Sequence, residues 1–180
     1  LPILQKIKNS KEIIDDSLIY KTAPKEKLDE LTKDILAHIG FDLSKGRISE
    51  SAHPFTTILG ENDVGITSRY KTIWDTITTD THEGGHGIYD QNIDPELAKT
   101  ILYDGTSLGI HESQSRLYET QLGQSLPFWK YYFPKLKQMF PAEFQDIDLK
   151  EFYKSINKVT PMPIRNVSDE TYLKIKELAK

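Results

Sequence analysis

The stretch TIWDTITTDTHEGGHGIYD, residues 72–90, contains the pattern that decides this fold. Its hydrophobic spacing predicts a helix, and the helix includes the motif HExxH from His82 to His86. Two histidines four residues apart lie about 40° apart around a helix, so both rings can bind one tetrahedral metal ion. Glu83 directly follows the first histidine, which places its carboxylate near an open coordination position rather than on the metal. The stretch therefore predicts a helical protein with a hydrolytic metal site.

The same motif has a simpler interpretation, an exposed pair of histidines on a polar helix face. Gly84 and Gly85 argue against it, because each costs about 0.5–1 kcal/mol relative to alanine inside a helix. A purely structural helix would gain stability if both were replaced. We therefore expect another backbone or a substrate to approach this face of the helix closely.

Two histidines leave zinc one protein ligand short, and Glu112 is the best candidate for the third. It lies on a second predicted helix, about 107–122, which can turn back to face the first helix across a metal ion. Glu112 can also form an ion pair with Arg116 at i+4, with Glu119 on the same stripe, and both roles can hold together. Other candidates are Asp104, Glu119 and His111, although we expect His111 to pack near the site or line it.

The rest of the chain also reads as mainly helical. Apolar residues fall on one helical face between Thr22 and Gly40, at positions Leu28, Leu31, Ile35 and Ile39. Residues 56–59 and 64–67 flank the turn-forming Gly60-Glu61-Asn62-Asp63, which predicts a small hairpin. Further helices are predicted over about 127–139 and 148–157. A last helix begins near residues 168–169 and has no stop signal, which suggests a piece of a longer protein.

Composition excludes several classes of function. The 180 residues include no cysteine, so disulfide scaffolds and cysteine-ligated metals are excluded. A net charge of -4, from 23 Lys+Arg against 27 Asp+Glu, gives no basic stripe for nucleic acid. The apolar runs are far shorter than the ~18 residues of a membrane span, and no signal peptide is evident. These features predict a soluble protein.

Several motifs in one order resemble the carboxypeptidase Taq family of metallocarboxypeptidases, which are helical, gluzincin-like HExxH enzymes. The resemblance covers residues 50–180, with residues 1–49 as a helical lead-in, so that residues 1–180 form a single piece of a larger helical enzyme. The matching stretches are His53-Pro54-Phe55-Thr56, Asn62-Asp63-Val64-Gly65-Ile66-Thr67, His82 to Gln91, Gly109 to Glu119 and Ile164-Arg165-Asn166-Val167-Ser168-Asp169.

The resemblance implies an activity and a set of site residues. His82, His86 and Glu112 would bind one divalent metal ion, most often zinc, with cobalt or manganese as alternatives. Glu83 would be the catalytic general base, and a peptide substrate would lose one amino acid from its C-terminus. Members of the family are cytoplasmic and often homodimeric, so a homodimer and a cytoplasmic location are expected by analogy.

The chain also departs from the family pattern. The family hairpin motif reads DxRxT, whereas this chain has Gly65 at the position of the arginine. That arginine could bind the terminal carboxylate of a substrate, because a guanidinium binds both oxygens. Arg165 is the remaining candidate, with Arg69 and Arg116 behind it. Arg165 can equally form a cap or a surface ion pair with Asp169.

Two further features bear on function. The resemblance makes His53 a groove-lining residue, whereas the HPF sequence by itself predicts a structural corner with Phe55 in the core. The aromatic cluster from Phe128 to Phe133 predicts packing in a core or at a dimer surface. The family's final Gln-Asp-x-His-Trp motif has no counterpart here. A metal-binding but catalytically incompetent fragment or diverged homologue therefore stays open as the alternative function.

Overall fold

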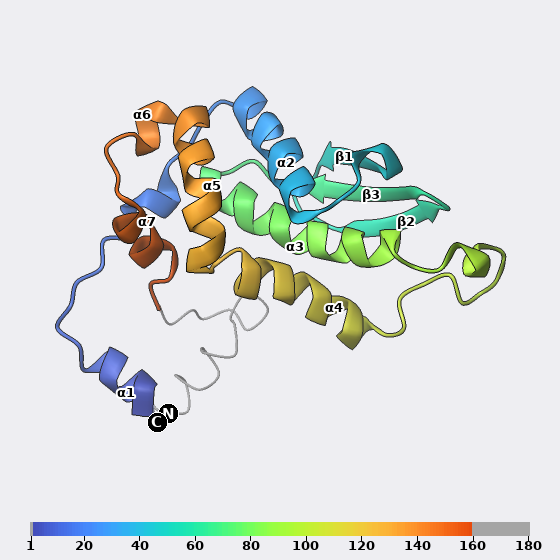
Figure 1. Ribbon diagram of the computed structural model, residues 1–180, viewed down its shortest axis with the longest axis horizontal. Helices are drawn as coiled ribbons and strands as arrows, with labels where there is room; N and C mark the ends of the chain where they lie inside the picture. The colour runs from blue at the N-terminus through green and yellow to red at the C-terminus, as the bar shows by residue number, and fades with distance from the viewer. Residues whose placement is uncertain (1, 160–180) are drawn as a thin grey trace.

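The structure, a computed structural model, describes residues 2–159. Helices form most of it, and one small sheet lies beside the longest helix (Figure 1). The predicted fold class, mainly α with a small β-element, is confirmed. The α-helices and strands are α1 (Pro2–Lys8), α2 (Lys25–Ile39), β1 (Gly46–Glu50), β2 (Thr56–Gly60), β3 (Asp63–Ser68), α3 (Ile73–Gln91), α4 (Leu108–Arg116), α5 (Leu126–Met139), α6 (Pro141–Phe144) and α7 (Leu149–Ile156). Short 3-10 helices span Ser17–Tyr20, Leu43–Lys45 and Pro95–Lys99.

Most predicted helices have a counterpart in the structure. The predictions over 72–90, 127–139 and 148–157 correspond to α3, α5 and α7. The prediction over 107–122 corresponds to α4 followed by a π-helix, Leu117–Leu122. The helix expected near residues 168–169 lies outside the described residues. Across residues 2–159, no helix has both the length and the apolar character that crossing a membrane requires.

The sheet contains the predicted hairpin and one strand that was not predicted. β2 and β3 pair antiparallel around a turn in which Asn62 has a positive φ of 57°. β1 pairs with β3 in parallel, so the strand order is β1-β3-β2. This strand belongs to the predicted helical lead-in, and it has a single apolar residue, Ile48, too weak a pattern to indicate a strand.

Helix α3 packs against other elements on several sides. Thr72 caps its start, because the Thr72 hydroxyl accepts a hydrogen bond from the Asp75 amide at 3.0 Å. A methyl group at Gly84 would lie 2.5 Å from the Ile39 side chain of α2, and one at Gly85 would lie 2.8 Å from the Cα of Ser115 in α4. The expected close approach is therefore confirmed, and at Gly85 the neighbour is a backbone.

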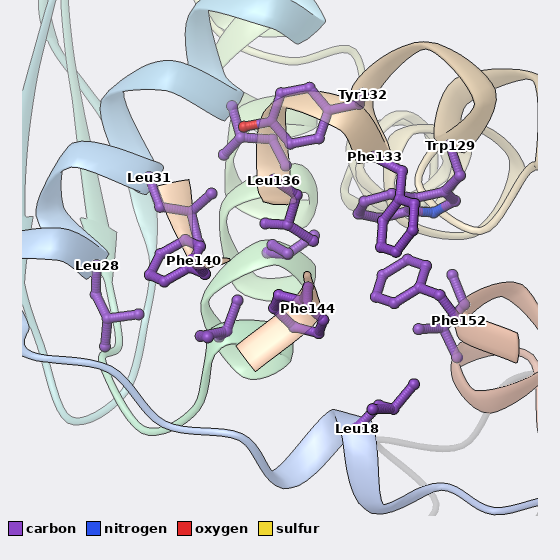
Figure 2. Close-up of a cluster of buried hydrophobic side chains, with 14 residues drawn as sticks. Leu18, Leu28, Leu31, Trp129, Tyr132, Phe133, Leu136, Phe140, Phe144 and Phe152 are labelled. Carbon is purple, nitrogen blue, oxygen red and sulfur yellow. The ribbon is translucent and has the colours of Figure 1, made fainter. Parts of the chain in front are cut away.

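The larger core lies where α5, α6 and α7 meet α2 and the start of α3 (Figure 1). Trp129 and Tyr132 are fully buried, and Phe133 stacks on Phe152 with ring centroids 4.6 Å apart (Figure 2). The indole nitrogen of Trp129 donates a hydrogen bond to the Gly123 carbonyl at 2.7 Å. Most of the predicted aromatic cluster is therefore internal core, although Tyr131 is exposed.

Candidate metal site

Helices α3 and α4 run antiparallel and bring the predicted ligands together. His82, in the middle of α3, contacts Glu119 just beyond the end of α4, whereas Asp90, near the end of α3, contacts His111 near the start of α4. The two helices therefore run in opposite chain directions. Between these contacts, the Nε2 atoms of His82 and His86 lie 3.6 Å and 3.4 Å from Glu112 Oε2. Ligand atoms from all three residues lie within 4.8 Å of one another. The close approach at Gly85 allows this spacing between the helices.

The carboxylate of Glu112 has two different surroundings. Its Oε2 faces the two histidines and accepts a hydrogen bond from the Ser115 hydroxyl at 3.2 Å. Its Oε1 lies 3.3 Å from Arg116 Nε, so the predicted ion pair is present as well. The guanidinium of Arg116 also donates to Glu119 at 3.0 Å. Oε2 of Glu112 therefore faces the two histidines, whereas Oε1 is paired with Arg116.

The two histidines present the same ring nitrogen to the centre of the cluster. Each Nε2 faces Glu112, and each Nδ1 is occupied on the outer side. His82 Nδ1 lies 2.8 Å from Glu119 Oε2, and His86 Nδ1 lies 2.5 Å from His111 Nδ1. Glu119 and His111, two of the alternative ligands, therefore contact the outer side of the histidines. Asp104, the third alternative, lies in the wall of the adjoining cavity.

Protonation favours metal binding at His86. Burial, together with the neighbouring His82 and His111, lowers the pKa of His86 to about 4. The ring is therefore neutral at pH 7, which is the form that binds a metal. Burial opposes a charged His82, but hydrogen bonding to Glu119 and the nearby carboxylates outweigh it and raise its pKa above the ordinary value. A metal ion at His82 would compete with that proton.

Glu83, the predicted base, is mostly buried beside the ligands, with only 7% of its surface exposed. The Thr56 hydroxyl, on β2, contacts Glu83 Oε2 at 2.7 Å and the Glu83 carbonyl at 3.0 Å. Burial raises the pKa of Glu83, although the hydrogen bond from Thr56 opposes the shift. The sequence did not reveal Thr56, because this contact joins a strand to a helix 27 residues away.

A cavity of about 760 Å³ opens beside the cluster. The cavity is lined by residues of β2 and the segment just before it, of α3, of α4 and of the loop before α4. They include Phe55, Glu83, His86, Tyr103, His111 and Glu112. Phe55 is 52% exposed and lies in this wall, so the prediction that it belongs to the core was wrong. His53 is exposed and stands outside this lining. The neighbouring residues of the HPF motif, rather than its histidine, therefore form part of the wall.

The predicted substrate-binding arginines have other surroundings. Arg116 is paired with Glu112 and Glu119, and Arg69 binds Asp75 through two contacts of 2.9 Å and 2.5 Å. Arg165 lies outside the described residues. None of the cavity-lining residues in the described part of the chain is a lysine or an arginine.

Gly65 lies on the side of the sheet that faces away from α3. Its neighbours in β3, Val64 and Ile66, are buried in the smaller core with residues of α2. Because side chains alternate along a strand, a side chain at position 65 points to the opposite face. A methyl group there would meet Leu59, an exposed residue, at 3.2 Å. A methyl group at position 65 would also lie 3.6 Å from the side chain of Thr57, its partner in β2, and Thr57 lines the cavity. The chain therefore has glycine, in place of the family's arginine, next to a cavity-lining residue.

A helical protein in which an HExxH helix meets a glutamate from an antiparallel helix has the architecture of a metallopeptidase. Comparison with known proteins gives the family. The chain belongs to the carboxypeptidase Taq (M32) metallopeptidase family, whose model matches residues 1–175. The recognition made from the sequence motifs is confirmed, and membership implies a divalent metal.

Relatives with known names are carboxypeptidases. The chain is 42% identical over 172 residues to Carboxypeptidase 1 of Bacillus subtilis, covering 94% of this chain and 34% of that protein. It is 37% identical over 174 residues to Thermostable carboxypeptidase 1 of Thermus thermophilus, covering 93% of this chain and 33% of that protein. The chain therefore spans about a third of the length of these relatives.

Solved structures show the same relationship. The Pyrococcus furiosus carboxypeptidase matches with a TM-score of 0.86 at 34% identity, over 98% of this chain and 36% of that one. The M32 carboxypeptidase from Deinococcus radiodurans R1 matches with a TM-score of 0.83 at 33% identity, over 90% of this chain and 33% of that one. The helical fold described above is therefore the fold of M32 carboxypeptidases in this region.

Proposed function

We propose that this chain provides the metal site and the general base of a metallocarboxypeptidase. The observation that carries the proposal is the convergence of His82, His86 and Glu112, whose ligand atoms lie within 4.8 Å of one another beside Glu83. Two imidazole nitrogens and one carboxylate oxygen are a donor set typical of catalytic zinc, and cobalt or manganese also accept it. Both Nε2 atoms face the same carboxylate oxygen, as a shared metal requires.

The bound metal would supply Lewis acidity, lowering the pKa of a water molecule and polarising the scissile carbonyl of a peptide. Glu83 would accept the proton of that water and deliver it to the leaving amine. Burial supports this role, because it raises the pKa of Glu83 and so makes the carboxylate a better proton acceptor. The Thr56 hydroxyl would fix the orientation of the carboxylate.

The substrate would be a peptide that enters the cavity of about 760 Å³. Phe55 and Tyr103 offer apolar and aromatic surface to its side chains. A carboxypeptidase also needs a cation for the terminal carboxylate. Arg165 stays the prediction for that role, since Arg69 and Arg116 are already paired with carboxylates. A homodimer remains an expectation by family analogy.

A second candidate function is metal binding without turnover. The observation that favours it is Gly65 at the position of the family's arginine, together with a cavity wall that has no lysine or arginine among the described residues. Such a chain would bind metal at the same three residues and hydrolyse no peptide. Activity, rather than metal content, distinguishes the two functions.

The test is metal content by mass spectrometry together with hydrolysis of an N-blocked dipeptide. We expect about one bound metal per chain, and Glu83→Gln should keep the metal while turnover falls at least a thousandfold, because only the proton acceptor is removed. Glu61→Gln, an identical change in the exposed hairpin turn, should behave as the parent. Equal hydrolysis by Glu83→Gln and the parent would refute the role of Glu83. An inactive parent with a full metal site would favour the second function.

A further inference from the structure

The structure contains an imidazole–carboxylate pair that the proposed reaction does not use. His111, near the start of α4, places its Nε2 atom 2.8 Å from Asp90 Oδ1, near the end of α3. The Asp90 side chain is only 3% exposed. The other ring nitrogen of His111 lies 2.5 Å from Nδ1 of His86. Asp90, His111 and His86 thus form one continuous chain of contacts that ends at a predicted metal ligand.

With Asp90 ionised and His111 neutral, hydrogen-bonding rules set the direction of this chain. An ionised carboxylate can only accept, so His111 Nε2 must donate to Asp90. A neutral imidazole has one N–H, which leaves His111 Nδ1 as an acceptor. His86 Nδ1 must therefore donate to it. The lone pair of His86 is then on Nε2, the atom that faces Glu112 at 3.4 Å.

We propose that Asp90 and His111 act as a positioning dyad that fixes the tautomer and the ring orientation of His86 for metal binding. The inference rests on the proposed function, because it assigns a purpose to groups outside the proposed ligand set. It extends a known arrangement, in which a metal-bound histidine donates its second N–H to a carboxylate. His82 shows this arrangement directly, because its Nδ1 lies 2.8 Å from Glu119 Oε2. At His86, a second histidine stands between the ligand and the carboxylate.

The surroundings of His111 hold its ring in this position. The rings of Tyr89 and His111 meet edge to face with centroids 5.0 Å apart. On another side lies Gly105, where a methyl group would be only 2.6 Å from His111 Cδ2. Asp90 lies one helical turn after His86, so both face α4 from the same side of α3. The dyad is therefore built by two packed helices and the loop between them.

Three substitutions test the dyad. His111→Phe removes both ring nitrogens but keeps a planar ring. His111→Asn keeps an acceptor, because its amide oxygen occupies nearly the position of Nδ1. Asp90→Asn replaces an obligate acceptor with a group that both donates and accepts. Asp94→Asn is the matched control, since Asp94 is exposed and asparagine caps a helix as well as aspartate does.

Two measurements read out the result: zinc affinity by competition with a chromogenic chelator, and the His86 tautomer by long-range proton–nitrogen NMR of the metal-free chain. In the parent we expect a single tautomer protonated at Nδ1. His111→Phe should give a tautomer mixture and lower the zinc affinity about 10- to 100-fold. His111→Asn should restore most of the affinity, Asp90→Asn should lose less than His111→Phe, and Asp94→Asn should match the parent.

The outcomes separate this inference from the proposed function. A parent that binds zinc, with the same His86 tautomer and the same affinity in His111→Phe, would overturn the dyad and leave the metal site intact. Loss of affinity in His111→Phe without any change of tautomer would also overturn the dyad, because the effect would then be one of packing alone. A folded parent that binds no zinc would overturn the proposed function, and with it the purpose of the dyad.

Discussion

At the scale of single residues, the two glycines of the HExxH motif differ in the neighbours that a methyl group would meet. A methyl group at Gly85 would meet the backbone of α4, at Ser115 Cα and at the Gln114 carbonyl oxygen 3.0 Å away. A methyl group at Gly84 would meet the ends of the Leu36 and Ile39 side chains, which can move. Position 85 therefore sets the distance between the two helices that hold the predicted ligands, and position 84 does not.

This difference predicts opposite results for two alanine substitutions. Gly85→Ala should push α4 away from α3, lower the free energy of unfolding by about 1–3 kcal/mol, and weaken zinc binding at least tenfold. Gly84→Ala should leave zinc affinity within about twofold of the parent, because the neighbouring side chains repack and alanine favours the helix. Chemical denaturation and chelator competition measure both quantities. Equal zinc affinity in the two variants would contradict this account.

The candidate site shows which residues a sequence can reveal. His82, Glu83 and His86 follow from a spacing within one helix, and Glu112 follows from a second helix that faces the first. Thr56 and Asp90 form their contacts only between elements, so nothing local indicated the parts they take. His111 was expected near the site and lines the cavity, but its contact with Asp90 was not predicted. Phe55 was placed wrongly because an aromatic residue near a proline predicts a core position, whereas here it borders a cavity.

At the scale of elements, α3 begins at a well-defined cap. The Thr72 hydroxyl accepts a hydrogen bond from the Asp75 amide, and the motif begins ten residues later. Thr72→Ala should lower the free energy of unfolding by about 1 kcal/mol, and Thr72→Ser should cost only a few tenths, since serine caps equally well. Zinc affinity should be unchanged in both, because the ligands lie more than two turns from the cap. Equal stability in the two variants would show that the cap contributes nothing.

Helices were predicted well and the remaining elements less well, for physical reasons. The face of α2 formed by Leu28, Leu31 and Ile35 is buried as the helical period indicates. Strand β1 has no such pattern, and it exists because β3 offers it a parallel partner. The π-helix Leu117–Leu122 was predicted as a plain continuation of α4. Its Glu119 contacts His82, in agreement with the tendency of π-helices to occur near functional sites.

At the scale of the whole molecule, α3 connects two cores. Ile73 and Ile77, in its first turns, belong to the larger core with α5 and α7. Its second half lies between the sheet and α4 (Figure 1). The predicted ligands and the cavity are at this half. The larger core can therefore support the first half of α3 while the second half remains open to a ligand. A metal ion would join α3 to α4 at this open end.

This arrangement predicts that metal stabilises the whole chain. Zinc at one hundred times its dissociation constant should raise the free energy of unfolding by about 2.7 kcal/mol, because it binds the folded chain and the ligands separate on unfolding. A chelator should reverse the gain. Glu112→Gln should lose most of it, whereas Glu96→Gln, an exposed change outside the cluster, should keep it. Thermal or urea denaturation with and without zinc measures these differences. Equal stabilisation of the parent and Glu112→Gln would place the zinc elsewhere, and no stabilisation of the parent would contradict a metal shared by the two helices.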